Sequence, residues 1–221
     1  HFAPTERAML WPDALGLGLF AATGTAIALE SSMPSIVAVL MGVVTASFGD
    51  ATLVHLVASV IPDADVVLLD TGYLFAETDW YADDLRRRYG LNLRTLHPLP
   101  EVERDVWRTA PDACCAARKV EPLQRALVGK AAWITGLRRS DSPSRAATPV
   151  VHADLLRGVT KINPIAAWTD GEVATYGRTH DLPTHPLADR GYGSIGCWPC
   201  TRPVAEGEDD RAGRWAFGAA V

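Results

Sequence analysis

Four cysteines are the residues of this sequence best suited to chemistry, and they fall as two close pairs. Cys114 and Cys115 are adjacent, whereas Cys197 and Cys200 form a Cys-x-x-Cys turn. Such a turn presents two thiolates on one side of the chain, as a tetrahedral metal ion or an iron–sulfur cluster requires. The side chains of two adjacent cysteines diverge, which is awkward around one zinc ion but suits a cubane with separate irons. The pattern therefore favours a [4Fe–4S] cluster over zinc.

Two other interpretations of these cysteines stay open. A thioredoxin-like redox pair ranks third, because Cys197 does not follow the strand and helix start that such a motif has. Structural thiols unrelated to one another are the plain alternative. Four cysteines in 221 residues are too few for a disulfide scaffold, so the pairs indicate ligation in a reducing compartment. We therefore expect the protein in the cytoplasm.

A second candidate site is the arginine-rich segment 136–145. Three guanidinium groups fall within eight residues there, among hydroxyl side chains, Gly and Pro. Guanidinium groups bind phosphate or sulfate through forked pairs of hydrogen bonds. Solvated surface arginines are the plain alternative. With two lysines from other segments, the residues expected to bind such an anion are Lys119, Arg138, Arg139, Arg145 and Lys161.

A third candidate site is the short turn Asp70, Thr71 and Gly72, which follows an apolar run. A carboxylate and a hydroxyl at the end of a strand can hydrogen-bond a ribose or the edge of an adenine. Glycine lets the backbone turn closely past such a ligand. The same three residue types also make a plain turn before a helix, so this signal is weak alone.

The pattern from residue 51 onward is that of an α/β domain, with short apolar runs alternating with amphipathic stretches. This order predicts a parallel sheet with helices on both faces. Ligands of such sheets bind beyond the carboxyl ends of the strands, where the second and third candidate sites fall. We expect strands over 65–70, 91–96, 131–135 and 159–163.

Two helices of this domain have clear signals at their ends. The helix expected over 77–89 has acidic residues early and three arginines in its last turn, as the helix dipole favours, and Gly90 follows it. A second helix is expected to open at Thr169, whose capping box is completed by Glu172, and to run to about His180.

Residues 1–50 differ in amino-acid composition from the rest of the chain. Two nearly uncharged runs, 14–29 and 35–49, are rich in Gly, Ala and Thr. Each is shorter than the ~18 apolar residues that indicate a membrane helix. Small residues such as Gly16 and Gly42 nevertheless suit packing between helices in a membrane. Two buried helices of a soluble protein are the equally supported alternative, so membrane association of residues 11–49 stays open.

The charge balance excludes one class of partner. Acidic residues outnumber basic ones, 26 against 21, which gives a net charge of −5. No overall positive field exists to hold a nucleic-acid backbone, so we expect no nucleic-acid partner. Any anion that the protein binds must be small and met by a local cluster of cations.

Several segments occur together in one order: Leu69 to Gly72, Cys114 to Lys119, Thr135 to Arg145, Lys161 to Asp170, Gly191 to Cys200, and Gly213 to Trp215. Over residues 51–215 the chain resembles the assimilatory adenylyl-sulfate (APS) reductases, the iron–sulfur branch of the sulfonucleotide reductases. Residues 11–50 resemble a repeat of small bacterial membrane proteins related to trimeric intracellular cation channels. These resemblances divide the chain into segments 1–50 and 51–221.

The resemblance to APS reductases implies an adenine nucleotide α-hydrolase-like fold and a [4Fe–4S] cluster on the four cysteines. Asp70, Thr71 and Gly72 would line the nucleotide, and the arginine and lysine side chains would hold the phosphosulfate. The implied activity is reduction of adenylyl sulfate to sulfite and AMP with thioredoxin, in sulfate assimilation toward cysteine. A homo-oligomer is compatible with this family.

Two departures from the family pattern bear on activity. The family carries a C-terminal tail whose cysteine attacks the sulfate sulfur, and no fifth cysteine occurs in these 221 residues. The family also has a Ser-rich phosphate loop, which residues 43–50 only approximate through Ser47 and Asp50. Two alternatives follow: a catalytically inert protein that binds nucleotide and an iron–sulfur cluster, or a membrane-associated fusion.

Overall fold

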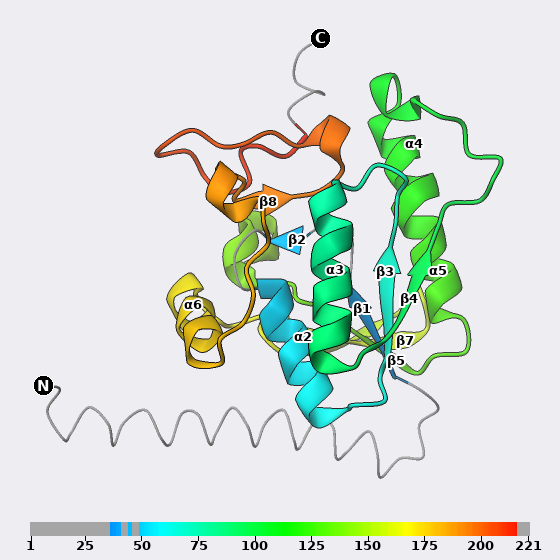
Figure 1. Ribbon diagram of the computed structural model, residues 1–221. Helices are drawn as coiled ribbons and strands as arrows, with labels where there is room; N and C mark the ends of the chain where they lie inside the picture. The colour runs from blue at the N-terminus through cyan, green and yellow to red at the C-terminus, as the bar shows by residue number, and fades with distance from the viewer. Residues whose placement is uncertain (1–35, 41–43, 46–48, 216–221) are drawn as a thin grey trace, which may run out of the picture. The chain divides into compact units, whose positions relative to one another are not determined.

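A six-stranded sheet forms the centre of the described structure (Figure 1). The computed structural model describes residues 36–40, 44–45 and 49–215. The strand order is β4-β3-β1-β5-β7-β6, in which all neighbours are parallel except the antiparallel pair β6 and β7. The strands are β1 (Ile36–Leu40), β3 (Asp65–Leu69), β4 (Asn92–Leu96), β5 (Ala132–Ile134), β6 (Val151–Asp154) and β7 (Val159–Ile162). A separate two-stranded sheet pairs β2 (Val44–Thr45) with β8 (Ser194–Ile195).

The four strands expected from the sequence are confirmed as β3, β4, β5 and β7, each within two residues of its expected ends. Strand β6 was not expected. It is short, it lies at the edge of the sheet, and His and Asp alternate in it with Val and Ala. An edge strand buries too little apolar surface to leave a long hydrophobic run in the sequence.

The expectation of a helix over 35–49 is wrong for the part of that run that the structure describes. Residues 36–40 form β1, which pairs with β3 on one side and β5 on the other. A short apolar run rich in Val and Ile suits a central strand, and periodicity alone does not separate such a run from a buried helix. The range 1–50 therefore contributes a strand to the α/β sheet. The run 14–29 lies outside the described residues.

The two helices with clear end signals are confirmed. Helix α3 (Ala76–Tyr89) ends at Gly90, whose φ of 62° is left-handed and whose N–H donates to the carbonyl of Arg86. Helix α6 (Asp170–Thr179) opens with the expected capping box, in which the Glu172 N–H donates to Thr169 Oγ1 over 3.2 Å. The remaining helices are α2 (Gly49–Val60), α4 (Pro111–Cys115) and α5 (Glu121–Leu127).

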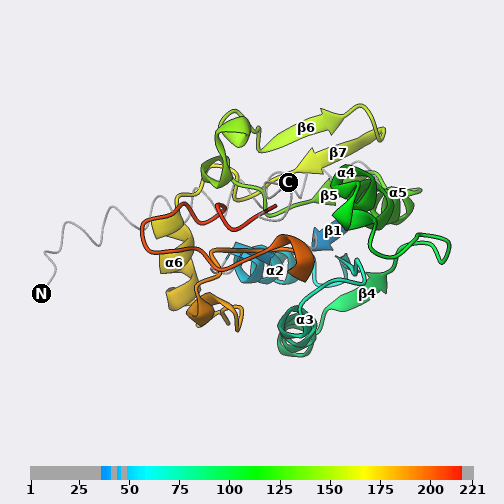
Figure 2. The ribbon, with the colours of Figure 1, turned by 90° about the horizontal axis from the view of Figure 1, so that it is seen from above.

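Helices cover both faces of the sheet, which confirms the α/β fold class (Figure 2). Neighbouring side chains of one strand point to opposite faces. Val66 of β3 therefore packs with α2 and α3, whereas Val67 packs with α5. In β5, Ile134 joins the first cluster and Trp133 the second.

The strand order places the candidate sites at one end of the sheet. The chain runs outward from β1 through β3 to β4, and then returns to β5 on the other side of β1. The point where the order reverses leaves a crevice at the carboxyl ends of the strands. The turn after β3 and the loop after β5 both begin at this end, and the segment 194–215 crosses it (orange and red in Figure 1).

Within residues 36–40, 44–45 and 49–215, no helix combines the length and apolar character that crossing a membrane requires.

His185 gives the fold a predicted pH dependence. Its ring is 1% exposed, Nδ1 accepts the Leu187 N–H over 3.1 Å, and Nε2 lies 3.1 Å from Thr78 Oγ1. Burial lowers the pKa of His185 to about 4, against 6.5 for an exposed histidine. The unfolded chain therefore binds the proton first, and stability that is complete above pH 6.5 falls as the pH drops toward 4.

Between pH 7 and pH 5, His185 is expected to lower the free energy of unfolding by about 2 kcal/mol. Urea unfolding at a series of pH values measures this loss. The His185→Gln variant is less stable at pH 7 but should lose less stability on acidification than the wild type. Equal pH slopes for both proteins would contradict the assignment.

Candidate functional site

The four cysteines line one pocket of about 420 Å³, partly open to solvent, at the carboxyl end of the sheet. All four are free thiols. Cys114 and Cys197 are buried, whereas Cys115 and Cys200 are half-buried, so each pair has one inner and one outer thiol. The sequence pairs are thus brought together from distant segments. The other residues that line the pocket are Tyr73, Trp107, Pro111, Arg118, Lys119, Pro199, Arg214 and Trp215.

The adjacent cysteines sit at a change of helix type. They close α4, and residues 116–120 continue as a π-helical turn before α5 begins at Glu121. Single π-helical turns are frequent at functional sites because the wider turn shifts the side chains that follow it. Here the turn carries Arg118 and Lys119, and both line the cysteine pocket.

Arg118 joins the turn after β3 to the pocket. Its guanidinium is buried and donates to the backbone carbonyls of Thr71 (3.0 Å) and Glu103 (2.9 Å). Thr71 is fully buried, and its Oγ1 lies 3.2 Å from Cys197 Sγ while accepting the Tyr73 N–H over 3.2 Å. Because Oγ1 accepts the Tyr73 N–H, the hydroxyl proton of Thr71 is free to point at the Cys197 sulfur, although either atom can be the donor of that contact.

The other two residues of this turn lie farther from the cysteines. Gly72 has a left-handed φ of 75°, and its N–H donates to Asp70 Oδ1 over 2.7 Å. The second oxygen of Asp70 lies 3.1 Å from His97 Nδ1, at the end of β4. The structure thus places the expected nucleotide turn where β3 and β4 end, with only Thr71 touching the cysteines.

Burial and the neighbouring thiols favour the protonated form of two of the cysteines, Cys114 and Cys200. Burial raises the pKa of Cys114, and the nearby Arg118 opposes this rise. Burial and the neighbouring Cys197 likewise raise the pKa of Cys200. Arg214 lies at the same pocket, where burial and then Arg211 lower its pKa to about 10, so it stays charged at neutral pH. An anionic group on the cysteines would find Arg118, Lys119 and Arg214 as its counter-charges.

The donor set fits an iron–sulfur cluster better than one metal ion. In the part of the chain that the structure describes, no group of three or more His, Cys, Asp or Glu side chains is close enough to hold a single ion. Four thiols that line a common pocket without a carboxylate or imidazole among them suit a group with sulfur ligands only. A cubane presents four separate irons, so its ligands need not converge on one point.

The arginines of segment 136–145 are partly engaged by acids. Arg138 is buried, and its guanidinium pairs with Asp170 (2.5 Å) and Asp141 (3.3 Å). Arg145 pairs with the same Asp141 over 3.0 Å. Arg139 is exposed, and its Nε donates to the carbonyl of Thr148 over 2.9 Å. Arg138 therefore fixes the loop to α6 with two acids, Arg145 is paired with one, and Arg139 has no acid partner among the described residues.

Of the two lysines expected at the anion, only Lys119 lines the cysteine pocket. Lys161 lies on β7, where its Nζ is 4.4 Å from the centre of the Trp133 ring. Burial lowers the pKa of Lys161, and Arg145 also acts in that direction from nearby. Ser47 lies outside the described residues.

Two further arginines, Arg211 and Arg214, connect the candidate sites, and sequence reasoning assigned neither. Arg211 is half-buried and interacts electrostatically with Arg145 and Asp141 on one side. On the other side it interacts with Arg214, which faces the cysteines. Arg214 also lies against Gly196, where an added Cβ would be 2.5 Å from its Nη2. The Gly213 to Trp215 motif was a signal for Arg214. Arg211 follows three acidic residues, 208–210, so the sequence around it does not read as a cluster of cations.

Comparison with known proteins gives two matching family models. The model of the phosphoadenosine phosphosulfate reductase domain matches residues 42–203. The model of a glycine transporter family matches residues 10–59. Within that second range, the described residues belong to β1, β2 and α2, which are parts of the α/β structure. The structure therefore gives no support to the membrane-like segment.

Curated relatives agree with the first family. An adenosine 5'-phosphosulfate reductase of Streptomyces coelicolor is 49% identical over 180 residues, 78% of this chain and 76% of the relative. The enzyme of the same name from Rhodococcus opacus is 44% identical over 181 residues, 79% of this chain and 73% of the relative.

Solved structures support the same fold. Phosphoadenylyl-sulfate reductase from Candida auris in a phosphate complex is 26% identical, with a TM-score of 0.65 over 78% of this chain and 86% of that one. FMN adenylyltransferase of Candida glabrata, 15% identical with a TM-score of 0.55, covers 79% of this chain and 59% of its own, and shares the fold alone. These neighbours confirm the adenine nucleotide α-hydrolase-like fold.

Proposed function

Because the chain belongs to the phosphoadenosine phosphosulfate reductase domain family, we propose that it is a sulfonucleotide reductase whose substrate is adenylyl sulfate. The observation that carries this proposal is the pocket lined by four cysteines next to Lys119 and Arg214. Cysteine pairs at these positions accompany the resemblance to the adenylyl-sulfate branch. The curated relatives named adenosine 5'-phosphosulfate reductase support the same substrate.

Cys114, Cys115, Cys197 and Cys200 would hold a [4Fe–4S] cluster. When bound, that group supplies a fixed local charge beside the substrate anion. The chain's own residues then do the binding: the Thr71 hydroxyl lies within hydrogen-bond distance of the Cys197 sulfur, and Lys119 and Arg214 line the pocket together with the cysteines. The four thiols and the cations line one pocket, and several of these side chains are buried.

The phosphosulfate would lie along the row of cations from the cysteine pocket to the arginine loop. Lys119 and Arg214 line the same pocket, Arg214 lies near Arg211, and Arg211 lies near Arg145, so these like charges repel one another until an anion lies among them. Several guanidinium groups beside a leaving phosphate stabilise the charge that develops on it. Asp70 and Gly72, at the end of β3, would contact the nucleoside. Arg139 and Lys161 stay predicted contacts.

The reaction is nucleophilic displacement at sulfur. The attacking thiolate is not one of the four pocket cysteines but, as the resemblance implies, a cysteine of a C-terminal tail: it attacks the sulfate sulfur, the bond from that sulfur to the bridging oxygen breaks, and AMP leaves with the electron pair. The cysteine now carries a thiosulfonate. A thiolate of reduced thioredoxin attacks the cysteine sulfur, sulfite leaves, and the second thioredoxin thiol closes a disulfide and frees the cysteine. The two electrons come from thioredoxin, and the product sulfite feeds cysteine synthesis.

The binding role of the cation row is tested by Arg145→Ala, with Arg87→Ala on the exposed face of α3 as the matched control. Loss of a charged hydrogen bond to the phosphosulfate is expected to cost about 1.5–3 kcal/mol, which is a weakening of roughly tenfold to a hundredfold. Titration calorimetry with adenylyl sulfate and with AMP measures this loss. The Arg87 variant should bind like the wild type.

Equal affinity of the wild type and Arg145→Ala for adenylyl sulfate would show that Arg145 does not contact the substrate. Absence of any binding by the wild type would overturn the proposed function itself. Arg138→Ala is a poor probe of binding, because Arg138 holds the loop to α6 through Asp170 and its loss would also lower stability.

A further inference from the structure

Three aromatic side chains, two of which line the cysteine pocket, pack together into a wall beside it, and the proposed reaction uses none of them. Tyr73 and Trp107 line the pocket. The ring of Trp198 lies 6.1 Å from that of Tyr73 and 6.3 Å from that of Trp107, edge to face in both cases. Such edge-to-face pairs are favourable beyond the area they bury.

Hydrogen bonds fix the wall from three separate parts of the chain. The Trp198 N–H donates to the carbonyl of Tyr73 over 2.9 Å. The Tyr73 hydroxyl accepts the Asp105 N–H over 2.9 Å, and Asp105 Oδ1 accepts Trp107 Nε1–H over 3.1 Å. The guanidinium of Arg118 stacks 4.7 Å from the Tyr73 ring centre. The wall is therefore a built structure and not a chance meeting of surface rings.

Trp198 is the outer member of the wall. It lies inside the Cys-x-x-Cys turn, directly after Cys197. Trp198 is 49% exposed, whereas Cys197 is 9% exposed. Its ring packs edge to face against Tyr73 and Trp107, the two members of the wall that line the pocket. Pro199 follows it and is buried, which fixes the turn from the other side.

We propose that the wall of Tyr73, Trp107 and Trp198 limits the access of water and small oxidants to the four cysteines. The idea extends the proposed function, because the group that it would protect is the cluster proposed there. An apolar shell around a metal site controls solvent access, and solvent exposure sets the redox properties of iron–sulfur clusters. Removing the outer ring should open one side of the pocket without removing a ligand.

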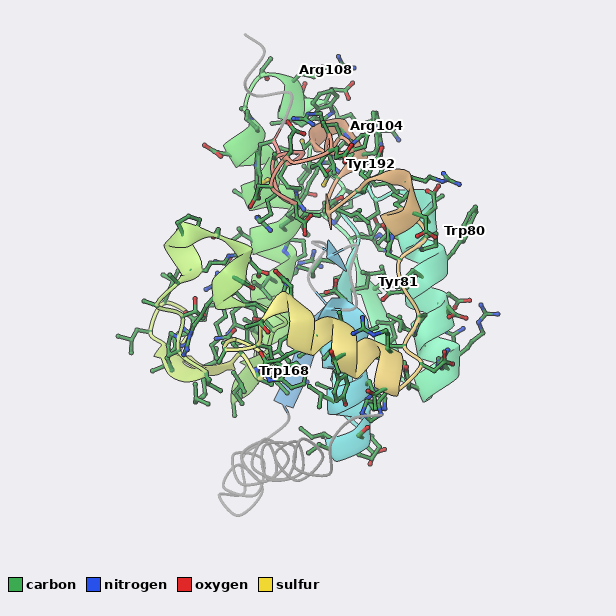
Figure 3. All side chains as sticks on the ribbon, turned by 90° about the vertical axis from the view of Figure 1, so that its left-hand side faces the viewer. Trp80, Tyr81, Arg104, Arg108, Trp168 and Tyr192 are labelled. Carbon is green, nitrogen blue, oxygen red and sulfur yellow. The ribbon has the colours of Figure 1, made fainter. Side chains whose placement is uncertain are left out.

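The test compares Trp198→Ala with Trp198→Phe and with Trp80→Ala. Trp80 is 67% exposed and projects outward from the side of α3 (Figure 3). Anaerobically purified proteins are mixed with aerated buffer, and the decay of the visible absorbance is followed. Trp198→Ala should bleach on the order of tenfold faster than the wild type. Trp198→Phe should restore most of the protection, and Trp80→Ala should change nothing.

A second measurement does not need the cluster. Iodoacetamide alkylation of each cysteine is followed by mass spectrometry, with circular dichroism to confirm that each variant is folded. Faster alkylation of Cys197 and Cys200 in Trp198→Ala than in Trp80→Ala would support the wall, whether or not the purified protein holds iron. Absence of iron would overturn the proposed cluster and leave the wall standing. Equal bleaching and equal alkylation in Trp198→Ala and the wild type would overturn the wall.

Discussion

The 221-residue chain, incubated with adenylyl sulfate and reduced thioredoxin, is expected to bind the nucleotide and to release no sulfite. Each of its four thiols lines the pocket proposed for the cluster, and a thiol that binds the cluster is not available to attack sulfur. Sulfite release is followed with a colorimetric thiol–sulfite assay. Nucleotide binding is measured on the same sample, so that an inactive protein is distinguished from an unfolded one.

A flexible C-terminal extension that ends in a cysteine should restore turnover. A tethered thiol reaches the site at an effective concentration in the millimolar range, which replaces an encounter in solution. The same extension with serine in place of the cysteine is the matched control and should stay inactive. Sulfite release by the unextended chain would refute the prediction and would make a pocket cysteine the nucleophile.

Anaerobically purified protein is expected to be brown and to hold about four irons per chain. Replacing one inner thiol, in Cys197→Ala, should remove most of the iron and the visible absorbance, because it takes both a ligand and the partner of the Thr71 hydroxyl. Binding energy of such groups is also folding energy, so the melting temperature should fall with the iron content. Thr71→Val keeps the four ligands and removes only the hydroxyl, and it should retain the iron.

Iron and zinc analysis by mass spectrometry decides this prediction. A colourless protein with one zinc per chain would reject the cluster. Full iron occupancy in Cys197→Ala would show that the four cysteines do not act as one ligand set.

The sequence predicted the sheet well where local signals were strong. The buried run 65–69, the charge order of α3 and the capping box at Thr169 each leave a pattern within a few residues. The helical stretch that carries Cys114 and Cys115 was missed, because Pro111 and Pro122 break the pattern. Both prolines stand in the first turn of a helix, where the missing N–H costs nothing.

The candidate site could be predicted only to the level of its segments. The sequence joined both cysteine pairs into one ligand set, and the structure brings the four thiols to one pocket. It could not show that Arg138 is held by Asp170, because an ion pair across 32 positions depends on the fold. It could not separate Arg211 from its acidic neighbours for the same reason. Pairing between distant charges leaves no periodic signal.

The two halves of the cysteine pocket come from parts of the α/β domain that are far apart in the chain. The adjacent pair closes α4, whereas the second pair lies in the segment that crosses the end of the sheet after α6. During synthesis, the ribosome therefore exposes Cys114 and Cys115 long before Cys197 and Cys200 emerge. A chain that stalls between the two pairs offers only two adjacent thiols, which cannot hold a cubane. If the four cysteines hold the proposed cluster, its iron and sulfide can be bound by all four ligands only after residues 197–200 have been translated.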